Sequence, residues 1–241
     1  MEKSTYKTAL NTPTTIYEDG EYLNNNQTWH TEDSPYKSRF VIETIQKNNV
    51  HFSTCADIGC GAGLVTELLA KKYPLKKFSG YELSPDAQHL IEQREKISNL
   101  NFYNENFLEQ GKRYDLVVCL DVFEHVEDYY SFLKSLKNKG EKFIFNIPLD
   151  MNVTKILTSG IKYAREEVGH LHYFNQYTAI ETLKDCGYNI KSTNLSVAFL
   201  KITPRNIRQA AILPIRLLSL LLGKNFAAKL FGGFSLVVYA E

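Results

Sequence analysis

Residues 55–64, CADIGCGAGL, place three alternate glycines between an apolar segment and the start of a helical one. Gly59, Gly61 and Gly63 allow positive φ angles, and they let a ligand approach the backbone where a Cβ atom would clash. Glu82 follows nineteen residues after Gly63, at the end of the next apolar segment. A carboxylate there can accept hydrogen bonds from both hydroxyls of a ribose that lies across the strand ends. The stretch therefore predicts a nucleotide-type site rather than a tight loop alone.

Short apolar runs alternate with helical segments after this point, which is typical of right-handed βαβ units and a parallel sheet. Two more β-like runs follow, Ser192–Ile202 and Phe234–Ala240, with about thirty residues between them. The pattern predicts a doubly wound, Rossmann-like α/β domain whose last two strands form an antiparallel hairpin interrupted by an insertion. The five predicted parallel strands are Cys55–Ile58, Phe78–Glu82, Asn101–Tyr103, Leu116–Leu120 and Phe143–Ile147.

The predicted helices begin and end at residues with known positional preferences. Ser34-Pro35 is typical of a helix start, with Ser34 as the capping residue and Pro35 in the first helical position, and the apolar face continues to about Lys47. Gly187 is typical of the left-handed residue that follows a helix. The other predicted helices are Leu64–Lys72, Ser84–Ile97, which a second Ser-Pro pair opens, Tyr129–Lys137 and Gln176–Cys186.

The glycine spacing indicates which nucleotide the turn accommodates. A dinucleotide fingerprint has the pattern G-x-G-x-x-G, whereas here the position of its third glycine is Leu64. Asp57, before the first glycine, would repel a pyrophosphate but suits a cationic ligand that carries an amine. A nicotinamide-dependent oxidoreductase is therefore disfavoured. A protein of the same fold that binds a cofactor without chemistry remains an alternative.

The run DIGCGAG, followed by YELSP, resembles the class I S-adenosylmethionine-dependent methyltransferases over roughly residues 50–190. The resemblance implies a seven-stranded, mostly parallel sheet and S-adenosyl-L-methionine as the cofactor. It also implies that the methionine portion lies beside residues 57–63 and that Glu82 holds the ribose. The candidate cofactor-binding residues are Asp57, Gly59, Cys60, Gly61, Gly63, Glu82, Leu83, Asn106, Phe107, Leu120 and Asp121.

Asn106 and Phe107 are the candidates for the adenine contact. In the family an Asp often follows the third strand and accepts a hydrogen bond from the adenine amino group, with the next apolar residue against the ring. Here the amide of Asn106 can accept that bond but carries no charge, and Phe107 is the apolar neighbour. The alternative is that Asn106 is a capping residue in a turn.

The run LDVFEHV, residues 120–126, resembles the ubiquinone-pathway O-methyltransferases and places Asp121 to His125 at the floor of an acceptor pocket. The Asn/Asp-Pro-Pro-aromatic motif of nucleic-acid N-methyltransferases is absent. The chain also has 28 basic and 27 acidic residues, without the surplus of Lys and Arg that phosphate backbones attract. We therefore expect a small or lipid-linked acceptor, methylated at oxygen, and no nucleic acid.

An oxygen acceptor benefits from a base, and His suits that task near neutral pH. The catalytic candidates are His125, Glu124, His170 and His172. His170 and His172 alternate, so at most one should face the acceptor. The resemblance allows Asp121, Glu124 and His125 to hold a divalent metal. The favoured expectation is no metal, with Glu124 starting a helix and His125 hydrogen-bonded to backbone.

We divide the chain into an N-terminal extension with a lid helix, residues 1–48, and a methyltransferase domain, residues 49–241. Residues 149–175 lie where this fold commonly builds a substrate lid. Between the last two strands the family has a tight turn, whereas this chain has the insertion 203–232. The N-terminal segment from Trp29 to Lys37 could close the cofactor site from above.

Charge is concentrated in the insertion. Residues 201–232 contain six Lys and Arg and no acid, so the rest of the chain carries −5 against a total of +1. Two interpretations stay open. The helices could pack on their own domain or on a second subunit in a homodimer. Alternatively, residues 205–230 could lie in a membrane interface, with leucines among the headgroups and cations on anionic lipid.

The chain has no feature typical of secretion or membrane spanning. The segment MEKSTYKTALNTPTT lacks a hydrophobic leader core, and the longest apolar run, Ala210 to Leu222, has 13 residues and contains Pro214 and Arg216. The four cysteines show no CxxC spacing. We therefore expect a cytoplasmic protein, either free or peripheral at the inner membrane surface.

Overall fold

In the computed structural model, residues 29, 31–197 and 207–241 are described. Their strands form one seven-stranded sheet in the order β3-β2-β1-β4-β5-β7-β6, in which β7 pairs antiparallel with both β5 and β6 and the other pairs are parallel. The predicted fold class is confirmed. The strands are β1 (Thr54–Ile58), β2 (Lys77–Tyr81), β3 (Leu100–Tyr103), β4 (Tyr114–Leu120), β5 (Gly140–Pro148), β6 (Ile190–Val197) and β7 (Phe234–Ala240).

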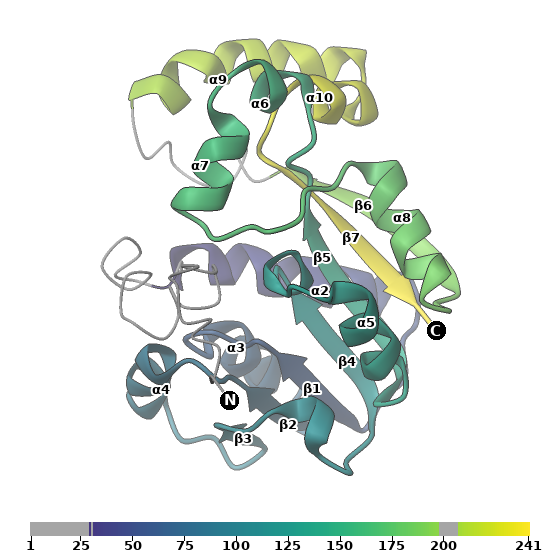
Figure 1. Ribbon diagram of the computed structural model, residues 1–241. Helices are drawn as coiled ribbons and strands as arrows, with labels where there is room; N and C mark the ends of the chain where they lie inside the picture. Colours follow the sequence, from purple (N-terminus) through teal and green to yellow (C-terminus); the bar gives the residue numbers. More distant parts are fainter. Residues whose placement is uncertain (1–28, 30, 198–206) are drawn as a thin grey trace, which may run out of the picture.

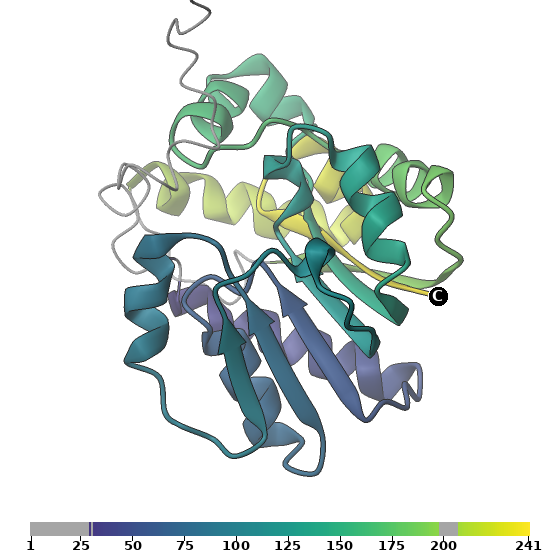
Figure 2. The same ribbon diagram turned by 60° about the horizontal axis from the view of Figure 1, so that its bottom comes forward.

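Helices cover both faces of this sheet, and Figures 1 and 2 show α2 and α3 behind it and α5 in front. The α-helices of the described residues are α2 (Ser34–Lys47), α3 (Leu64–Lys72), α4 (Pro85–Glu92), α5 (Tyr129–Lys137), α6 (Val153–Leu157), α7 (Gly160–Glu166), α8 (Gln176–Asp185), α9 (Ile207–Ser219) and α10 (Lys224–Leu230). The 3₁₀ turns are η2 (Thr31–Asp33), η3 (Phe107–Glu109), η4 (Phe123–His125) and η6 (Leu220–Leu222).

Alternation along the central strands divides the core in two. In β4, Val117 and Cys119 pack with α5 and α8, whereas Leu116 and Val118 pack with α2 and α3. All four side chains are buried because the sheet is covered on both faces. This packing of helices on both faces fixes where the carboxyl ends of the parallel strands lie relative to one another.

Several predicted element ends differ from the structure. Ser34 is the first residue of α2 rather than its cap, and Asp33 occupies the capping position without a side-chain hydrogen bond. Helix α4 ends at Glu92, five residues before the predicted end at Ile97. Gly187 follows α8 with φ +87°, as predicted. The last residues of the predicted strand Ser192–Ile202 lie outside the described part.

The strand order reverses between β1 and β4, because β1 continues to β2 on one side and β4 continues to β5 on the other. A crevice forms at such a point beyond the carboxyl ends of the strands, where α/β proteins bind ligands. Figure 1 shows α6, α7, α9 and α10 together beyond the end of β5. The hydroxyl of Thr154 on α6 donates to the carbonyl of Leu230 on α10 at 2.5 Å, joining the two segments.

Candidate active site

The glycine turn is held against the end of β2. The N–H groups of Gly59 and Cys60 both donate to the carbonyl oxygen of Tyr81, at 2.9 and 3.1 Å. Gly59 and Gly63 have φ angles of +65° and +76°. A Cβ atom would lie 2.8 Å from Val122 at Gly59 and 2.7 Å from Phe102 at Gly63. The turn therefore requires glycine for both backbone conformation and packing.

Asp57 lies buried at the end of β1, with 2% of its surface exposed. The hydroxyl of Thr66 on α3 donates to its Oδ2 atom at 2.6 Å. Burial raises the pKa of Asp57 to about 7, and the hydrogen bond from Thr66 only partly opposes this. A cationic group beside Asp57 would favour its ionised form.

Glu82 directly follows β2, and backbone groups orient its carboxylate. Oε2 accepts a hydrogen bond from the N–H of Gly61 at 2.9 Å, and Oε1 accepts from Leu83 and Ser84 at 2.8 and 2.9 Å. A carboxylate offers about four acceptor positions, so it can take a further donor while remaining in this place.

Asp121 follows β4 and connects two elements across the site. Its φ is +55°, an uncommon value for a residue other than glycine. Asn146 of β5 donates to Oδ1 at 2.7 Å, and the ammonium group of Lys37 on α2 lies 2.6 Å from Oδ2. The N-terminal helix thus reaches into the site through Lys37, a residue to which the sequence pattern gave no individual role.

These groups surround a pocket of about 610 Å³. Trp29 and Tyr163 of the two predicted lid segments also line it, whereas His30 lies outside the described residues. The predicted residues that do not line it are Gly63, Asn106, Phe107, Glu124 and His172. Those that do are Asp57, Gly59, Cys60, Gly61, Glu82, Leu83, Leu120, Asp121, His125 and His170.

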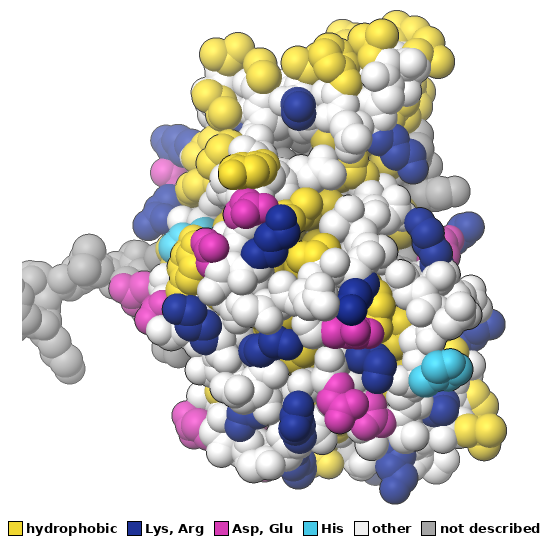
Figure 3. Space-filling view, turned by 90° about the vertical axis from the view of Figure 1, so that its right-hand side faces the viewer, with side chains coloured by type: hydrophobic (Ala, Val, Ile, Leu, Met, Phe, Trp, Pro, Cys, Tyr) yellow, Lys and Arg dark blue, Asp and Glu magenta, His cyan; other side chains and the backbone are white. Residues whose placement is uncertain are grey.

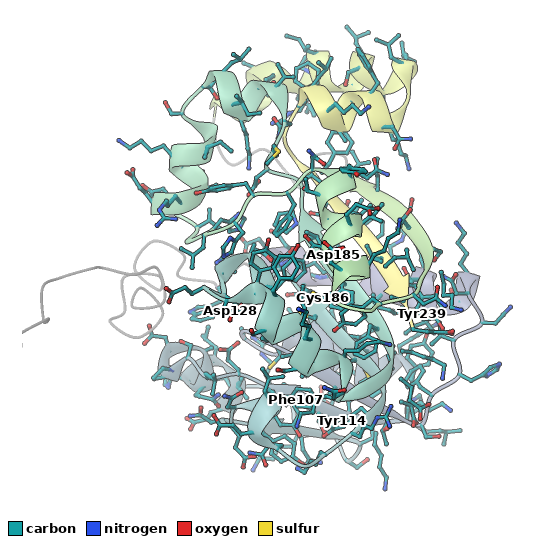
Figure 4. All side chains as sticks on the ribbon, turned by 45° about the vertical axis from the view of Figure 1, so that its right-hand side comes forward. Phe107, Tyr114, Asp128, Asp185, Cys186 and Tyr239 are labelled. Carbon is teal, nitrogen blue, oxygen red and sulfur yellow. The ribbon has the colours of Figure 1, made fainter. Side chains whose placement is uncertain are left out.

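Asn106 and Phe107 have other contacts. Asn106 caps η3, because its Oδ1 accepts from the N–H of Leu108 at 3.1 Å. Phe107 is buried in the core, with its ring centroid 4.8 Å from that of Tyr81 and 5.9 Å from that of Tyr114. Figure 4 shows Phe107 and Tyr114 side by side. This arrangement matches the capping alternative for Asn106.

His125 and His170 lie together, with ring centroids 4.8 Å apart. Nδ1 of His125 lies 3.0 Å from the carbonyl oxygen of Gly169, so this nitrogen carries the proton. Burial and the neighbouring His170 lower the pKa of His125 to about 3. His125 is therefore neutral near pH 7.

His170 is oriented by Asp150, a residue that the sequence pattern did not single out. Its Nδ1 atom is hydrogen-bonded to Oδ2 of Asp150, and Lys155 pairs with Oδ1 of the same carboxylate. Burial alone would raise the pKa of Asp150, but His170 and Lys155 outweigh it and lower the pKa to about 2. Asp150 follows β5 as Glu82 follows β2 and Asp121 follows β4, and that shared position was the available signal.

His172 and His170 lie in different environments, in agreement with their alternation. Nε2 of His172 lies 3.0 Å from the carbonyl oxygen of Val126, and its ring packs on Tyr129 at 4.4 Å. His172 therefore joins its loop to the start of α5, while His170 faces the pocket.

Glu124 is fully buried, and no group of the described residues hydrogen-bonds to either oxygen of its carboxyl group. Burial and the charge of Asp121 raise its pKa well above the usual value. Donor atoms of Glu124, His125 and His170 lie within 4.8 Å of one another. One carboxylate and two imidazoles form a donor set that suits a divalent transition metal. This donor set differs from the three residues that the family resemblance allows as metal ligands, because His170 takes the place of Asp121.

A family model described as a methyltransferase domain matches residues 32–193. This match covers more than half of the chain, so the chain belongs to that family, and the predicted recognition as a class I S-adenosylmethionine-dependent methyltransferase is confirmed. Among curated proteins, it is 31% identical to the ubiquinone biosynthesis O-methyltransferase of Rickettsia bellii, over 47% of this chain and 51% of that protein. The corresponding protein of Glaesserella parasuis is 25% identical, over 57% of this chain and 66% of the other.

The first of these matches thus spans about half the length of the curated relative.

Solved structures share the fold over nearly the whole chain. The plantazolicin methyltransferase BpumL, solved with S-adenosylhomocysteine, has a TM-score of 0.61, 16% identity and coverage of 95% and 93%. The magnesium protoporphyrin IX methyltransferase of Synechocystis has a TM-score of 0.57, 15% identity and coverage of 95% and 96%.

Proposed function

We propose that the protein transfers a methyl group from S-adenosyl-L-methionine to a hydroxyl oxygen of a small or lipid-linked acceptor. One observation carries this proposal: Asp57, Glu82, His125 and His170 all line the same pocket. The two carboxylates that we propose to hold the cofactor thus share one pocket with two candidate bases. The likeness to ubiquinone biosynthesis O-methyltransferases supports oxygen as the acceptor atom.

The pocket fits this cofactor on three counts. Gly61 brings backbone to the pocket without a side chain, and among the described residues a Cβ atom there would have only the ring of Trp29 within 4 Å, at 3.6 Å. Buried Asp57 suits the ammonium group of the methionine portion. Glu82, oriented by three N–H groups, suits the ribose hydroxyls. Cofactor binding therefore needs no rearrangement of the turn.

When bound, the cofactor would supply a methyl group on a sulfonium, with the neutral thioether as the leaving group for in-line attack by an acceptor oxygen. The chain then has to align the acceptor and remove its proton. We assign Nε2 of His170 as the base that accepts the proton of the hydroxyl, because Asp150 holds Nδ1 of that ring as a hydrogen-bond donor. His125 is neutral and can orient the hydroxyl. His172 and Glu124, predicted as catalytic, hold these elements in place in this scheme.

A divalent cation on Glu124, His125 and His170 is the second candidate arrangement, against the expectation of no metal. Among the described residues nothing hydrogen-bonds the buried carboxyl group of Glu124, and this favours the metal arrangement, since a buried polar group without a partner is costly. Such a cation would lower the pKa of the acceptor hydroxyl. Elemental analysis of the purified protein and of Glu124→Gln distinguishes the two arrangements. A stoichiometric metal that is lost in the variant would favour metal activation of the hydroxyl over activation by His170, and a protein without metal would favour His170.

Membrane contact through residues 205–230 is part of the proposal. The described residues contain no helix long and apolar enough to cross a membrane. Exposed side chains of α9 and η6 include Leu218, Leu221 and Leu222, which would suit an interface. A second copy of the chain, forming a homodimer, is the competing occupant of this surface. Either contact would leave the cofactor pocket intact.

Transfer of label tests the reaction. The protein would be incubated with S-adenosylmethionine carrying a tritium-labelled methyl group and with cell extracts divided into organic-soluble and water-soluble fractions. We expect base-stable label, as for an ether, in one fraction, and none with His170→Ala. Label in nucleic acid alone would contradict the assignment.

A further inference from the structure

A second groove, of about 640 Å³, lies between the insertion and the outer strand of the sheet. β6 is the last strand of the sheet among the described residues, and Thr193 and Asn194 line the groove from that strand. The opposite wall comes from both ends of the short helix α10, with Lys224 and Asn225 at its start and Lys229 near its end. Among the described residues, none that lines the groove is acidic.

The two lysines give this groove a positive charge that is not compensated locally. Lys224 and Lys229 are exposed, and no carboxylate of the described residues lies within 4.0 Å of either ammonium group. Other helical lysines do form ion pairs, such as Lys155 with Asp150 and Lys184 with Glu181. A phosphate group would satisfy both lysines, with the amides of Asn194 and Asn225 as further donors.

Apolar side chains form the rim of the same groove. Leu222 is 69% exposed and Phe226 is 44% exposed, and both line it. They continue into Leu218 and Leu221 of the insertion. Figure 3 shows hydrophobic side chains gathered over this end of the molecule, with Lys and Arg side chains beside them. A soluble phosphate compound would leave this rim in water.

We propose that the groove is a binding site for the phosphodiester headgroup of an anionic lipid, with Leu222 and Phe226 inserted beside its acyl chains. The inference rests on the proposed membrane contact and gives it a specific polar subsite. The proposal also implies an orientation of the enzyme on the membrane. Helix α10 is joined by the bond between Thr154 and Leu230 to α6, which belongs to the predicted acceptor lid and carries Lys155. The acceptor lid would then lie next to the membrane.

Sedimentation with vesicles tests the site. The probes are phosphatidylcholine vesicles with and without phosphatidylglycerol, and the variant is Lys224→Glu with Lys229→Glu. The matched control is Lys72→Glu with Lys77→Glu, which changes charge equally at exposed positions at the end of α3 and the start of β2. We expect at least about a tenfold loss of binding to anionic vesicles in the groove variant, and a change within about twofold in the control.

Each result has a defined meaning. Equal binding by the groove variant and the intact protein would overturn the site, and so would an equal loss in the control. Displacement from vesicles by soluble glycerol phosphate would show that the groove takes a free phosphate ester. An intact protein that does not sediment with anionic vesicles would overturn both the groove and the membrane contact. Binding of S-adenosylhomocysteine by every variant confirms folding and tests the cofactor assignment separately from the groove.

Discussion

Asp150 and His170 are joined side chain to side chain at the edge of the candidate active site, although twenty residues separate them in the chain. The carboxylate fixes the tautomer of the imidazole, so Nε2 rather than Nδ1 is the proton acceptor. Lys155 holds the other carboxylate oxygen. The pair therefore gives His170 a defined orientation before any acceptor binds.

Replacement of Asp150 by Asn should lower kcat roughly tenfold to hundredfold, as for other residues that orient a functional imidazole, with little change in KM. Nitrogen NMR of the histidine side chains should show loss of the single Nδ1-protonated tautomer. Lys155→Met, which leaves the hydrogen bond to Asp150 in place, should have a smaller effect. An unchanged tautomer together with unchanged kcat would show that Asp150 has no positioning role.

Glu82→Ala should weaken S-adenosylhomocysteine binding by about 1–3 kcal/mol, because two hydrogen bonds to a charged acceptor are lost. Isothermal titration measures this directly. Glu109→Ala is a suitable control, since that residue lies in η3 and does not line the pocket. Equal affinity of the Glu82 variant and the intact protein would contradict the ribose assignment.

Cofactor affinity should depend on pH through Asp57. Its pKa of about 7 means that the carboxylate is charged above that pH and protonated below it. Since the charged form attracts the ammonium group of the ligand, affinity should rise as pH increases through about 7. Titrations across this range should show a flat profile for Asp57→Asn. Affinity that falls with increasing pH in the intact protein would contradict the contact.

Gly63→Ala should destabilise the fold by about 1–3 kcal/mol, the usual cost of overpacking, because the new Cβ would lie 2.7 Å from the ring of Phe102 at positive φ. Denaturant unfolding of the variant measures the loss. Gly111→Ala is the matched control, since no atom lies within 4 Å of the corresponding Cβ position. A loss of stability at Gly111 equal to that at Gly63 would disprove the packing explanation.

The fold could be predicted because its signals are local. The glycine turn, the alternation of strands and helices and the basic insertion can each be read from one stretch of sequence. Together they predict a doubly wound, mostly parallel sheet that ends in an antiparallel hairpin. Helix ends were less secure. Ser34 lies inside α2 because η2 continues into the helix, and α4 stops at Glu92 although its composition continues to favour helix.

The site was harder to predict where function depends on distant partners. Asp57 lies near the end of β1 and Glu82 directly follows β2, and both line the pocket. Asp150, Lys37 and Lys155 belong to no sequence motif. Their place in the site follows only from the residues that the fold brings beside them. Conversely, Asn106 matches a family position in the sequence but uses its oxygen to cap η3.

Titration with S-adenosylhomocysteine and, separately, with a nicotinamide dinucleotide tests the central claim most directly. We expect micromolar binding of S-adenosylhomocysteine that Glu82→Ala weakens, and no response to the dinucleotide. Binding of the dinucleotide with no response to S-adenosylhomocysteine would contradict the account.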